Sequence, residues 1–403
     1  MTDPAAPVSI RPFGLYVLKV ASRCNLNCSY CYVYHKADMS WRQKPALMSE
    51  QTYEAALGRI LRHCRAARQR SVRLSFHGGE PMLLGARRFD SFCARAREVL
   101  ADVADVELSI QTNGTKIDAN WIEVFVRHNV RVGVSLDGLE ADHDRYRVDH
   151  RGRGSYQKIM RGLQYLRAAG IPWGILAVIQ PGVDPLPIHR EFATLSPQSI
   201  SYLWPDYTHD TIGNLRERFG PTPAADFIVP LYDEWLSSYP TGPHIQDFWN
   251  VTRLVLGGDS VVETFGNAPS NYAFVEADGE IEGLDVLKIC EEGMGKTGLN
   301  VLRSDFSELG ASRSFAARVI MDGLPLPIAC RVCPEQLTCA GGYLPHRYSR
   351  QNSFDNPSVW CADILEFFRH VRSTLGISPA ETDRRRAALA RRVRQDSSVG
   401  AKP

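Results

Sequence analysis

Short apolar runs alternate with amphipathic stretches from Leu15 to about Trp204. A short apolar run is typical of a buried strand, whereas apolar residues at every third or fourth position are typical of a helix. The runs predict strands at Leu15–Val20, Val72–His77, Val106–Gln111, Arg131–Leu136, Trp173–Ile179 and Ile200–Trp204. The amphipathic stretches predict helices at Ser49–Ala66, with Ser49 as N-cap, and at Ala86–Leu100, Asp118–His128, Tyr156–Ala169 and Pro187–Thr194.

This rhythm makes about six strand–helix units, and strands joined through helices run parallel in one sheet. The fold class is therefore α/β. Six units suit a partial (β/α)6, TIM-like barrel at least as well as an open sheet, and periodicity alone does not choose between them.

Four regions are expected along the chain. Residues 12–204 form the α/β core, and 205–273 form a bridging region with helices at Ala224–Tyr239 and Ile245–Leu256. Residues 274–372 are rich in glycine and cysteine, as in small domains held together by metal. Residues 373–403 form a basic tail in which Arg384–Arg394 predicts a helix and the last eight residues are predicted to be disordered.

The composition is that of a folded globular protein, with 44% apolar and 23% charged residues. The 47 basic and 45 acidic side chains give a net charge of +2, so a nucleic-acid partner is not expected. Neither a secretory signal nor a membrane-spanning apolar run is apparent, which predicts a cytoplasmic protein without membrane contact.

Most of the ten cysteines fall into two tight groups, which in a reducing compartment indicates metal sites rather than disulfides. The first group, RCNLNCSYCY, supplies Cys24, Cys28 and Cys31. A structural zinc ion normally has four protein ligands, whereas an iron–sulfur cluster held by three thiolates keeps one iron open. A zinc site that borrows a fourth ligand such as His35 is the alternative.

Three further motifs follow strands of the predicted core. The glycines of HGGEP, Gly78 and Gly79, allow a ligand to approach the backbone closely, and Glu80 can accept hydrogen bonds from an ammonium group. QTNGT places Asn113 at a strand end, although a simple turn is an equally good interpretation. SLDG supplies Ser135, and HDRYR supplies Arg147, whose guanidinium suits a carboxylate.

With these motifs the chain resembles the radical S-adenosylmethionine (SAM) superfamily, whose signature is this cysteine spacing with an aromatic residue, here Tyr30, before the third cysteine. The resemblance implies a 4Fe–4S cluster whose open iron binds SAM, and reductive cleavage of SAM to a 5′-deoxyadenosyl radical. It implies that Tyr30 packs on the adenine and that the amine meets Gly78, Gly79 and Glu80. Asn113 belongs to the same site, Ser135 lies near the ribose, and Arg147 pairs with the SAM carboxylate; Arg145 and Arg153 are rivals for that role.

The second group comprises Cys330, Cys333, Cys339 and Cys361, and four thiolates can enclose either a cluster or a zinc ion. It resembles the SPASM extension of peptide-modifying radical SAM enzymes, which usually has seven cysteines and two auxiliary clusters. This chain departs from that pattern at Tyr343, Gly283 and Leu284, which predicts a single auxiliary 4Fe–4S cluster.

The remaining cysteines have simpler interpretations. Cys64 and Cys93 lie on apolar helix faces and are predicted to be core residues. Cys290 is a ligand, a catalytic thiol or a buried small side chain.

The segments LYVLKVASRCNLNCSYCYVYHKADMSWR, PDYTHD, DGEIEGLDVLKIC and CAGGYLPHRYS resemble the FxsB-type SPASM peptide maturases, from about Gly14 to about Phe367. This resemblance implies a three-residue cyclophane, in which an aromatic ring is linked to a β-carbon of a ribosomal precursor peptide. It also implies an external electron donor such as flavodoxin or ferredoxin. The alternatives are formylglycine formation as in sulfatase maturation, a thioether link, epimerisation, or a non-catalytic iron–sulfur or zinc protein.

The sequence does not identify a catalytic base. Asp206, His209 and Asp210 follow the last predicted core strand, where they could face a site or form an exposed polar loop. Tyr343 and His346 follow the second cysteine group and could line a peptide channel or pack the small domain.

Overall fold

The computed structural model describes residues 10–260, 262–266 and 271–399. The chain divides into two compact units. The first unit comprises Met1–Leu136, Glu140–Gly174 and Pro269–Leu324, and the second comprises Asp137–Leu139, Ile175–Ala268 and Pro325–Pro403.

The first unit is built on parallel strands whose neighbours follow the chain. These are β1 (Leu15–Ala21), β2 (Ser71–Gly78), β3 (Asp105–Thr112) and β4 (Arg131–Ser135). Three further strands extend the sheet beyond β1: β8 (Tyr272–Val275), parallel to β1, and then the antiparallel β9 (Glu280–Glu282) and β10 (Lys296–Asn300). The parallel arrangement was predicted. The three extra strands were not predicted, because they have only four, three and five residues.

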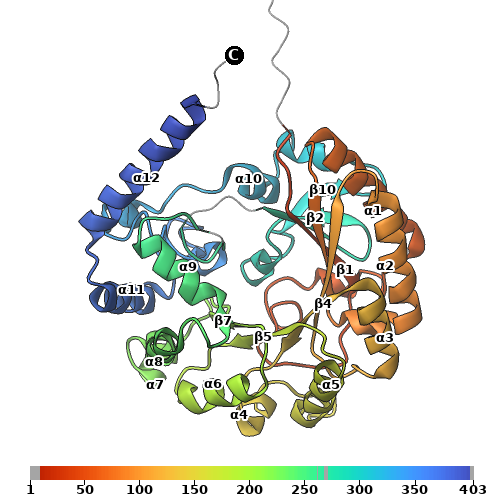
Figure 1. Cartoon of the computed structure of the whole chain (residues 1–403), viewed down its shortest axis with the longest axis horizontal. Helices are drawn as coiled ribbons and strands as arrows, with labels where there is room; N and C mark the ends of the chain where they lie inside the picture. The colour runs from red at the N-terminus through yellow and green to blue at the C-terminus, as the bar shows by residue number, and fades with distance from the viewer. Residues whose placement is uncertain (1–9, 261, 267–270, 400–403) are drawn as a thin grey trace, which may run out of the picture. The chain divides into compact units, whose positions relative to one another are not determined.

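Helices cover the strands of the first unit (Figure 1). Their bounds are α1 (Glu50–Ala66), α2 (Ala86–Leu100), α3 (Ala119–His128), α4 (Glu140–Asp144), α5 (Tyr156–Ala168) and α10 (Phe315–Asp322), with short 3-10 helices η1 (Ser40–Arg42), η2 (Pro81–Leu84), η3 (Asp285–Ile289) and η4 (Phe306–Gly310). Ser49 is the N-cap of α1, as predicted, and its hydroxyl accepts a hydrogen bond from the Thr52 amide at 3.0 Å.

Aromatic side chains fill the space between the strands and helices α1–α3. Tyr53 stacks on Phe92 with ring centroids 3.8 Å apart, and Phe76 from β2 meets Phe89 edge-on at 4.7 Å. All four rings are at most 3% exposed. Cys64 and Cys93 are fully buried among these helices, which confirms that they are core cysteines.

The second unit contains most of β5 (Trp173–Val178), with β6 (Ser199–Leu203) and the short parallel β7 (His244–Ile245). Its helices are α6 (Pro185–Thr194), α7 (Leu215–Phe219), α8 (Pro223–Ser238), α9 (Gln246–Val255), α11 (Cys361–Leu375) and α12 (Pro379–Val399), with 3-10 helices η5 (Ile328–Val332) and η6 (Leu344–Arg347). Asp363 of α11 accepts hydrogen bonds from the amides of Ala224 and Ala225, at 2.8 and 3.2 Å. A carboxylate from another helix thus satisfies the free N–H groups at the start of α8.

The tail differs from the prediction. Residues 396–399 continue α12 rather than being disordered, because the segment before them is rich in Ala and Arg, which favour helix. Residues 400–403 lie outside the described part of the chain.

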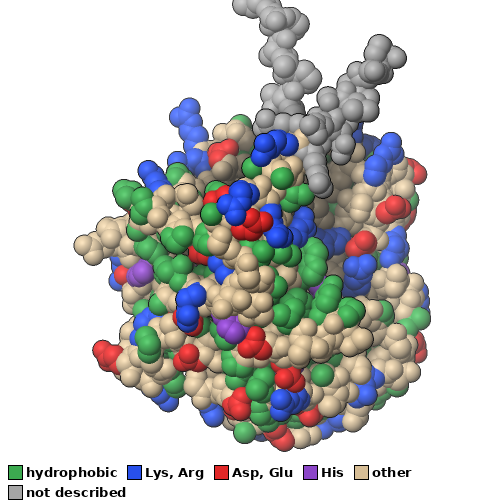
Figure 2. Space-filling view, turned by 60° about the vertical axis from the view of Figure 1, so that its left-hand side comes forward, with side chains coloured by type: hydrophobic (Ala, Val, Ile, Leu, Met, Phe, Trp, Pro, Cys, Tyr) green, Lys and Arg blue, Asp and Glu red, His purple; other side chains and the backbone are tan. Residues whose placement is uncertain are grey.

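The surface is electrically mixed. Figure 2 shows Lys and Arg interspersed with Asp and Glu over the visible face, in keeping with the near-zero net charge. Within the described residues, no helix combines the length and the apolar character that crossing a bilayer requires.

Candidate active site

The loop after β1, residues 23–34, carries the thiols of Cys24, Cys28 and Cys31. Backbone amides of this first thiol loop donate to the segment 146–150: Asn27 N to the Val148 carbonyl at 2.7 Å and Ser29 N to the Tyr146 carbonyl at 3.1 Å. The segment that contains Arg147 therefore holds the loop in place.

The thiols lie in an environment suited to metal ligands. The sulfur of Cys24 accepts hydrogen bonds from the Leu26 amide at 3.4 Å and from Asn113 Nδ2 at 3.7 Å. Burial, and then the charges of Glu80 and of the other two thiols, raise the pKa of Cys24 to about 12, so metal binding there must release a proton. N–H donors to sulfur and three neighbouring thiols fit a 4Fe–4S cluster with one open iron.

A single metal ion requires all of its ligands to converge on one point, whereas the ligands of a cluster bind different iron atoms. Across residues 10–260, 262–266 and 271–399, no three His, Cys, Asp or Glu side chains converge closely enough to hold one metal ion.

Gly78 and Gly79 allow the end of β2 to approach the first thiol loop. A Cβ at Gly78, where φ is +140°, would lie 2.1 Å from the Ala21 carbonyl oxygen, and one at Gly79 would lie 2.3 Å from that of Arg23. The Gly79 amide donates a hydrogen bond to the Ala21 carbonyl oxygen at 2.7 Å, and the Glu80 amide donates one to the Arg23 carbonyl oxygen at 2.9 Å. The two glycines are thus required by contact between protein backbones. Their predicted contact with SAM stays a prediction.

Glu80 is completely buried and joins the ends of β2 and β3. Its carboxylate accepts from Thr112 Oγ1 at 2.6 Å, from the Asn113 amide at 2.8 Å and from the Met82 amide at 3.0 Å. Burial raises the pKa of Glu80 despite these donors. Asn113 in turn donates to the sulfur of Cys24, so the Glu80 carboxylate positions a residue that contacts this thiol. The contact between Glu80 and the SAM amine stays a prediction.

The structure distinguishes the three arginines proposed for the SAM carboxylate. Arg147 is 9% exposed, and its guanidinium carbon lies 5.5 Å from the centroid of the Tyr30 ring. Arg153 pairs with Asp149 at 2.7 Å and its side chain is 63% exposed, whereas the Arg145 side chain is 54% exposed. Arg147 and Tyr30, both predicted as SAM contacts, are therefore brought together.

Ser135 ends β4, and its hydroxyl accepts a hydrogen bond from Gln111 Nε2 at 3.1 Å. It lies on the same edge of the sheet as the end of β3, where Asn113 follows. Its predicted ribose contact stays a prediction.

A buried network of charges beside the first thiol loop was missed by the sequence analysis. Lys19 lies 2.7 Å from Asp285 and 3.3 Å from Glu276, and Lys288 lies 2.5 Å from both Glu276 and Glu282. Burial disfavours the charge of Lys19, but Asp285 and Glu276 outweigh this and raise its pKa. The sequence did hold one indication of this network. Lys19 stands inside the apolar strand LYVLKVA, and a buried lysine needs an acidic partner.

Tyr32 links this network to the first thiol loop. Its hydroxyl donates to Asp285 at 2.5 Å, and it directly follows Cys31 in the chain. The segment DGEIEGLD, which contributed to the family resemblance, thereby supplies a partner for the loop.

The second unit carries the thiols of Cys330, Cys333, Cys339 and Cys361. Burial raises the pKa of Cys339 above its usual range, and the charges of the other three thiols add to this effect, so the four lie near one another. The Glu335 amide donates to the sulfur of Cys333 at 3.4 Å. Four thiols are the donor set of an all-thiolate iron–sulfur cluster, whose ligands bind different iron atoms and need not converge on one ion.

A buried ion pair fixes the second thiol loop, residues 330–339. Arg372 of α11 donates to both oxygens of Glu335, at 2.5 and 2.7 Å, and to Thr382 at 2.8 Å. Arg372 and Glu335 are 8% and 5% exposed. The loop is therefore anchored to both C-terminal helices.

The candidate bases separate into two groups. The His209 side chain bonds to the Pro357 carbonyl at 2.8 Å, and Asp210 accepts from the Arg350 amide at 2.9 Å, so both anchor their loop. Asp206 Oδ1 instead lies 3.5 Å from Nε2 of the buried His346, whose ring meets Tyr343 edge-on at 5.2 Å. Cys290 is 6% exposed, and its role stays open.

Comparison with known proteins agrees with this geometry. Residues 18–190 match the radical SAM superfamily. The chain is 25% identical over 372 residues to the cysteine-type anaerobic sulfatase-maturating enzyme of Clostridium novyi (strain NT), covering 91% of this chain and 97% of the relative. It is also 25% identical to the serine-type anaerobic sulfatase-maturating enzyme of Bacteroides thetaiotaomicron, covering 90% of both chains.

Solved structures show the same fold. A tagged form of anSMEcpe with bound AdoMet matches with a TM-score of 0.77 at 22% identity, covering 90% of this chain and 98% of that one. Streptococcus suis SuiB bound to precursor peptide SuiA matches with a TM-score of 0.57 at 15% identity, covering 87% and 76%. By its fold, and by the match of residues 18–190 to the radical SAM superfamily, the chain has the α/β partial barrel of a radical SAM enzyme with a C-terminal auxiliary region.

Proposed function

We propose that this enzyme oxidises a peptide substrate by radical chemistry. The observation that carries the proposal is the first thiol loop, with three thiols beside Asn113 and a buried arginine, in a chain similar over nine-tenths of its length to enzymes that mature sulfatases. Cys24, Cys28 and Cys31 would hold a 4Fe–4S cluster, which when bound supplies the electron that cleaves SAM.

Formylglycine formation is the better-supported reaction, because the relatives that cover most of this chain are sulfatase-maturating enzymes. A hydrogen atom leaves the β-carbon of a Ser or Cys residue with 5′-deoxyadenosine. The carbon radical then loses one electron to an acceptor and one proton to a base. This leaves an aldehyde where the substrate residue is Ser, and a thioaldehyde where it is Cys, which water converts to the aldehyde with release of hydrogen sulfide.

Cyclophane formation is the second candidate, favoured by the segments that resemble the FxsB-type peptide maturases. Here the β-carbon radical bonds to an aromatic ring, which then loses one electron and one proton. Both reactions need an acceptor and a base after the same first step. We propose one auxiliary 4Fe–4S cluster at the second thiol site as the acceptor, Asp206 with His346 as the first base to test, and flavodoxin or ferredoxin as donor.

The test uses the anaerobically reconstituted enzyme with SAM, dithionite and candidate peptides, including a sulfatase-derived peptide and any precursor encoded beside the gene. Formation of 5′-deoxyadenosine together with a peptide that has lost two hydrogens supports the proposal. Serine oxidation and crosslinking give the same mass change, so two further readouts separate them. An aldehyde reacts with a hydrazide probe, whereas a crosslinked ring resists fragmentation between its joined residues.

Some outcomes would contradict the proposal. Iron and sulfide incorporation without any 5′-deoxyadenosine would favour a non-catalytic metal protein. An unchanged peptide mass with an inverted α-carbon would indicate epimerisation and would contradict the proposed oxidation. A sulfur-to-carbon link, which also removes two hydrogens, would keep the oxidation but reject both candidate products.

A further inference from the structure

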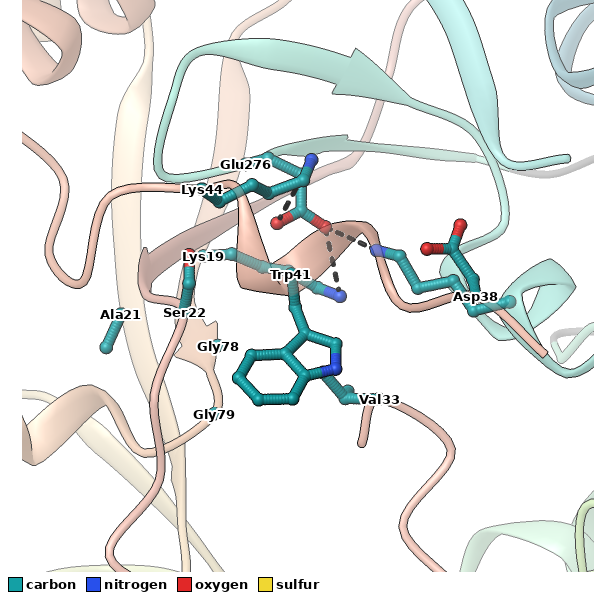
Figure 3. A pocket seen from close by; sticks show the side chains of 11 residues that line it. Lys19, Ala21, Ser22, Val33, Asp38, Trp41, Lys44, Gly78, Gly79 and Glu276 are labelled. Atoms are coloured by element: carbon teal, nitrogen blue, oxygen red, sulfur yellow. Dashed lines mark hydrogen bonds and ion pairs between the residues drawn. The ribbon is translucent and has the colours of Figure 1, made fainter. Parts of the chain in front are cut away.

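A small pocket opens beside the first thiol loop, within the first unit (Figure 3). Ser22 after β1, Trp41 of η1 and the turn glycines Gly78 and Gly79 line it together with lysines and acids of the buried network. We call it the Ser22 pocket. Its volume is about 10 Å³, which is the room that one water molecule or one ligand oxygen needs.

Two buried donors in the lining lack acceptors. Among the residues that the structure describes, Ser22 Oγ and Trp41 Nε1 are buried without a hydrogen-bond partner, and Ser22 is 5% exposed. A buried donor without an acceptor has lost its hydrogen bond to water, so such groups normally meet a ligand or an ordered water.

The acceptors of the lining are already engaged. The Asp38 carboxylate accepts hydrogen bonds from the amides of Ser40 and Gly293, at 2.7 and 2.9 Å. Glu276 pairs with Lys19, Lys288 and Lys44, and Figure 3 shows Lys19 and Lys44 beside its carboxylate.

The lysines keep donor capacity. An ammonium group has three N–H donors, and Lys19 and Lys288 each pair with two carboxylates among the described residues. Lys44, by contrast, lies within 4 Å of four carboxylates, so the spare donors of the lining are those of Lys19 and Lys288 together with Ser22 Oγ and Trp41 Nε1. An oxygen that accepts from these groups gains hydrogen bonds, and a carboxylate oxygen gains charge-assisted ones.

We propose that the Ser22 pocket receives one carboxylate oxygen of the peptide substrate. This inference rests on the proposed function, because it names a feature of the substrate of the same enzyme. The carboxylate could be the C-terminus of the peptide or an Asp or Glu side chain. Either would hold the peptide next to the turn that adjoins Glu80 and the loop that carries Cys24.

The test measures protection of the reconstituted holoenzyme against thermal unfolding by small probes, with saturating SAM throughout. N-acetyltriglycine carries a C-terminal carboxylate, N-acetylaspartylglycinamide carries a side-chain carboxylate, and N-acetyltriglycinamide carries neither. We expect protection by at least one acid and none by the neutral amide, and the acid that protects identifies the source.

Matched variants locate the effect. Ser22→Ala removes the hydroxyl, and Trp41→Phe removes the indole N–H while keeping a ring against Tyr34. We expect the apparent Kd of the acid probe to rise about tenfold in the double variant. Ser40→Ala is the control, because Ser40 is equally buried and precedes Trp41 but does not line the pocket.

Three results would overturn the inference: equal protection by acid and amide, equal weakening by Ser40→Ala, or a crystal soaked in formate that keeps a water in the pocket. The formation of 5′-deoxyadenosine and of modified peptide is measured separately. If the acid probe binds but no peptide is modified, the proposed function is rejected and the carboxylate site is kept. If peptide is modified but the acid probe does not bind, only the carboxylate site is rejected.

Discussion

The two thiol loops use similar ligands in different surroundings. The first has three thiols, a flanking glycine turn and hydrogen bonds from its backbone to the segment 146–150. The second also carries three thiols, which Cys361 of α11 brings to four, and it is anchored through Glu335 to Arg372 of α11. Three ligands leave a coordination position for a reacting molecule, whereas four close the site. Two cysteine-rich sites in one chain are therefore expected to differ in function. A site with an open coordination position can react, whereas a closed site can only store or pass electrons.

The largest expected effect comes from removing a ligand of the open site. Cys24→Ala should abolish 5′-deoxyadenosine formation and lower the iron content by about half, since the four-thiol site keeps its own cluster. Anaerobic reconstitution, iron analysis and chromatography of the products measure both quantities. Cys64→Ala is the control, because Cys64 is a buried core residue. Equal iron in the Cys24 variant and the unmutated enzyme would contradict this assignment.

The next effect concerns the anchor of the closed site. Arg372→Leu should lower the free energy of unfolding by about 3–5 kcal/mol, because it leaves the buried Glu335 carboxylate without its partner. Denaturant unfolding measures the change. Replacing Glu335 with Leu as well should recover part of the loss, since no unpaired charge then remains. If the single variant were as stable as the unmutated protein, the pair would not anchor the loop.

A smaller effect depends on pH in α9, which packs on α11. Burial, and then Glu263, raise the pKa of Asp247 to about 7. Its unfolded pKa is about 3.9, so between these values the folded state holds a proton that the unfolded state has lost, and stability falls as pH rises. Asp247→Asn should therefore raise the free energy of unfolding by about 1–3 kcal/mol at pH 8 and hardly change it at pH 4. Unfolding curves at both pH values decide the matter, and an equal gain at pH 4 would point to another cause.

The smallest effect tests the helix that precedes β2 in the first unit. Ser49→Ala should cost about 1 kcal/mol of stability, because the Thr52 amide loses its acceptor. Ser49→Asp keeps an acceptor and should retain most of the stability. Thermal unfolding of the two variants side by side measures the difference, and identical midpoints would show that the cap contributes little.

Local pattern determined much of this protein. The apolar runs and helical faces predicted β1–β6 and their helices to within one or two residues, and Ser49 was predicted as an N-cap, because these signals depend on neighbours in the chain. The cysteine spacing and the family resemblance pointed to the radical SAM class, which the superfamily match supports.

Only the tertiary structure decided which distant groups meet. It brought Lys19 to Asp285, Asn113 to Cys24 and Arg147 to Tyr30, and it assigned His209 and Asp210 to loop anchoring. Periodicity describes one element at a time, whereas a buried charge or donor is satisfied by whatever side chain the packing of other elements places beside it.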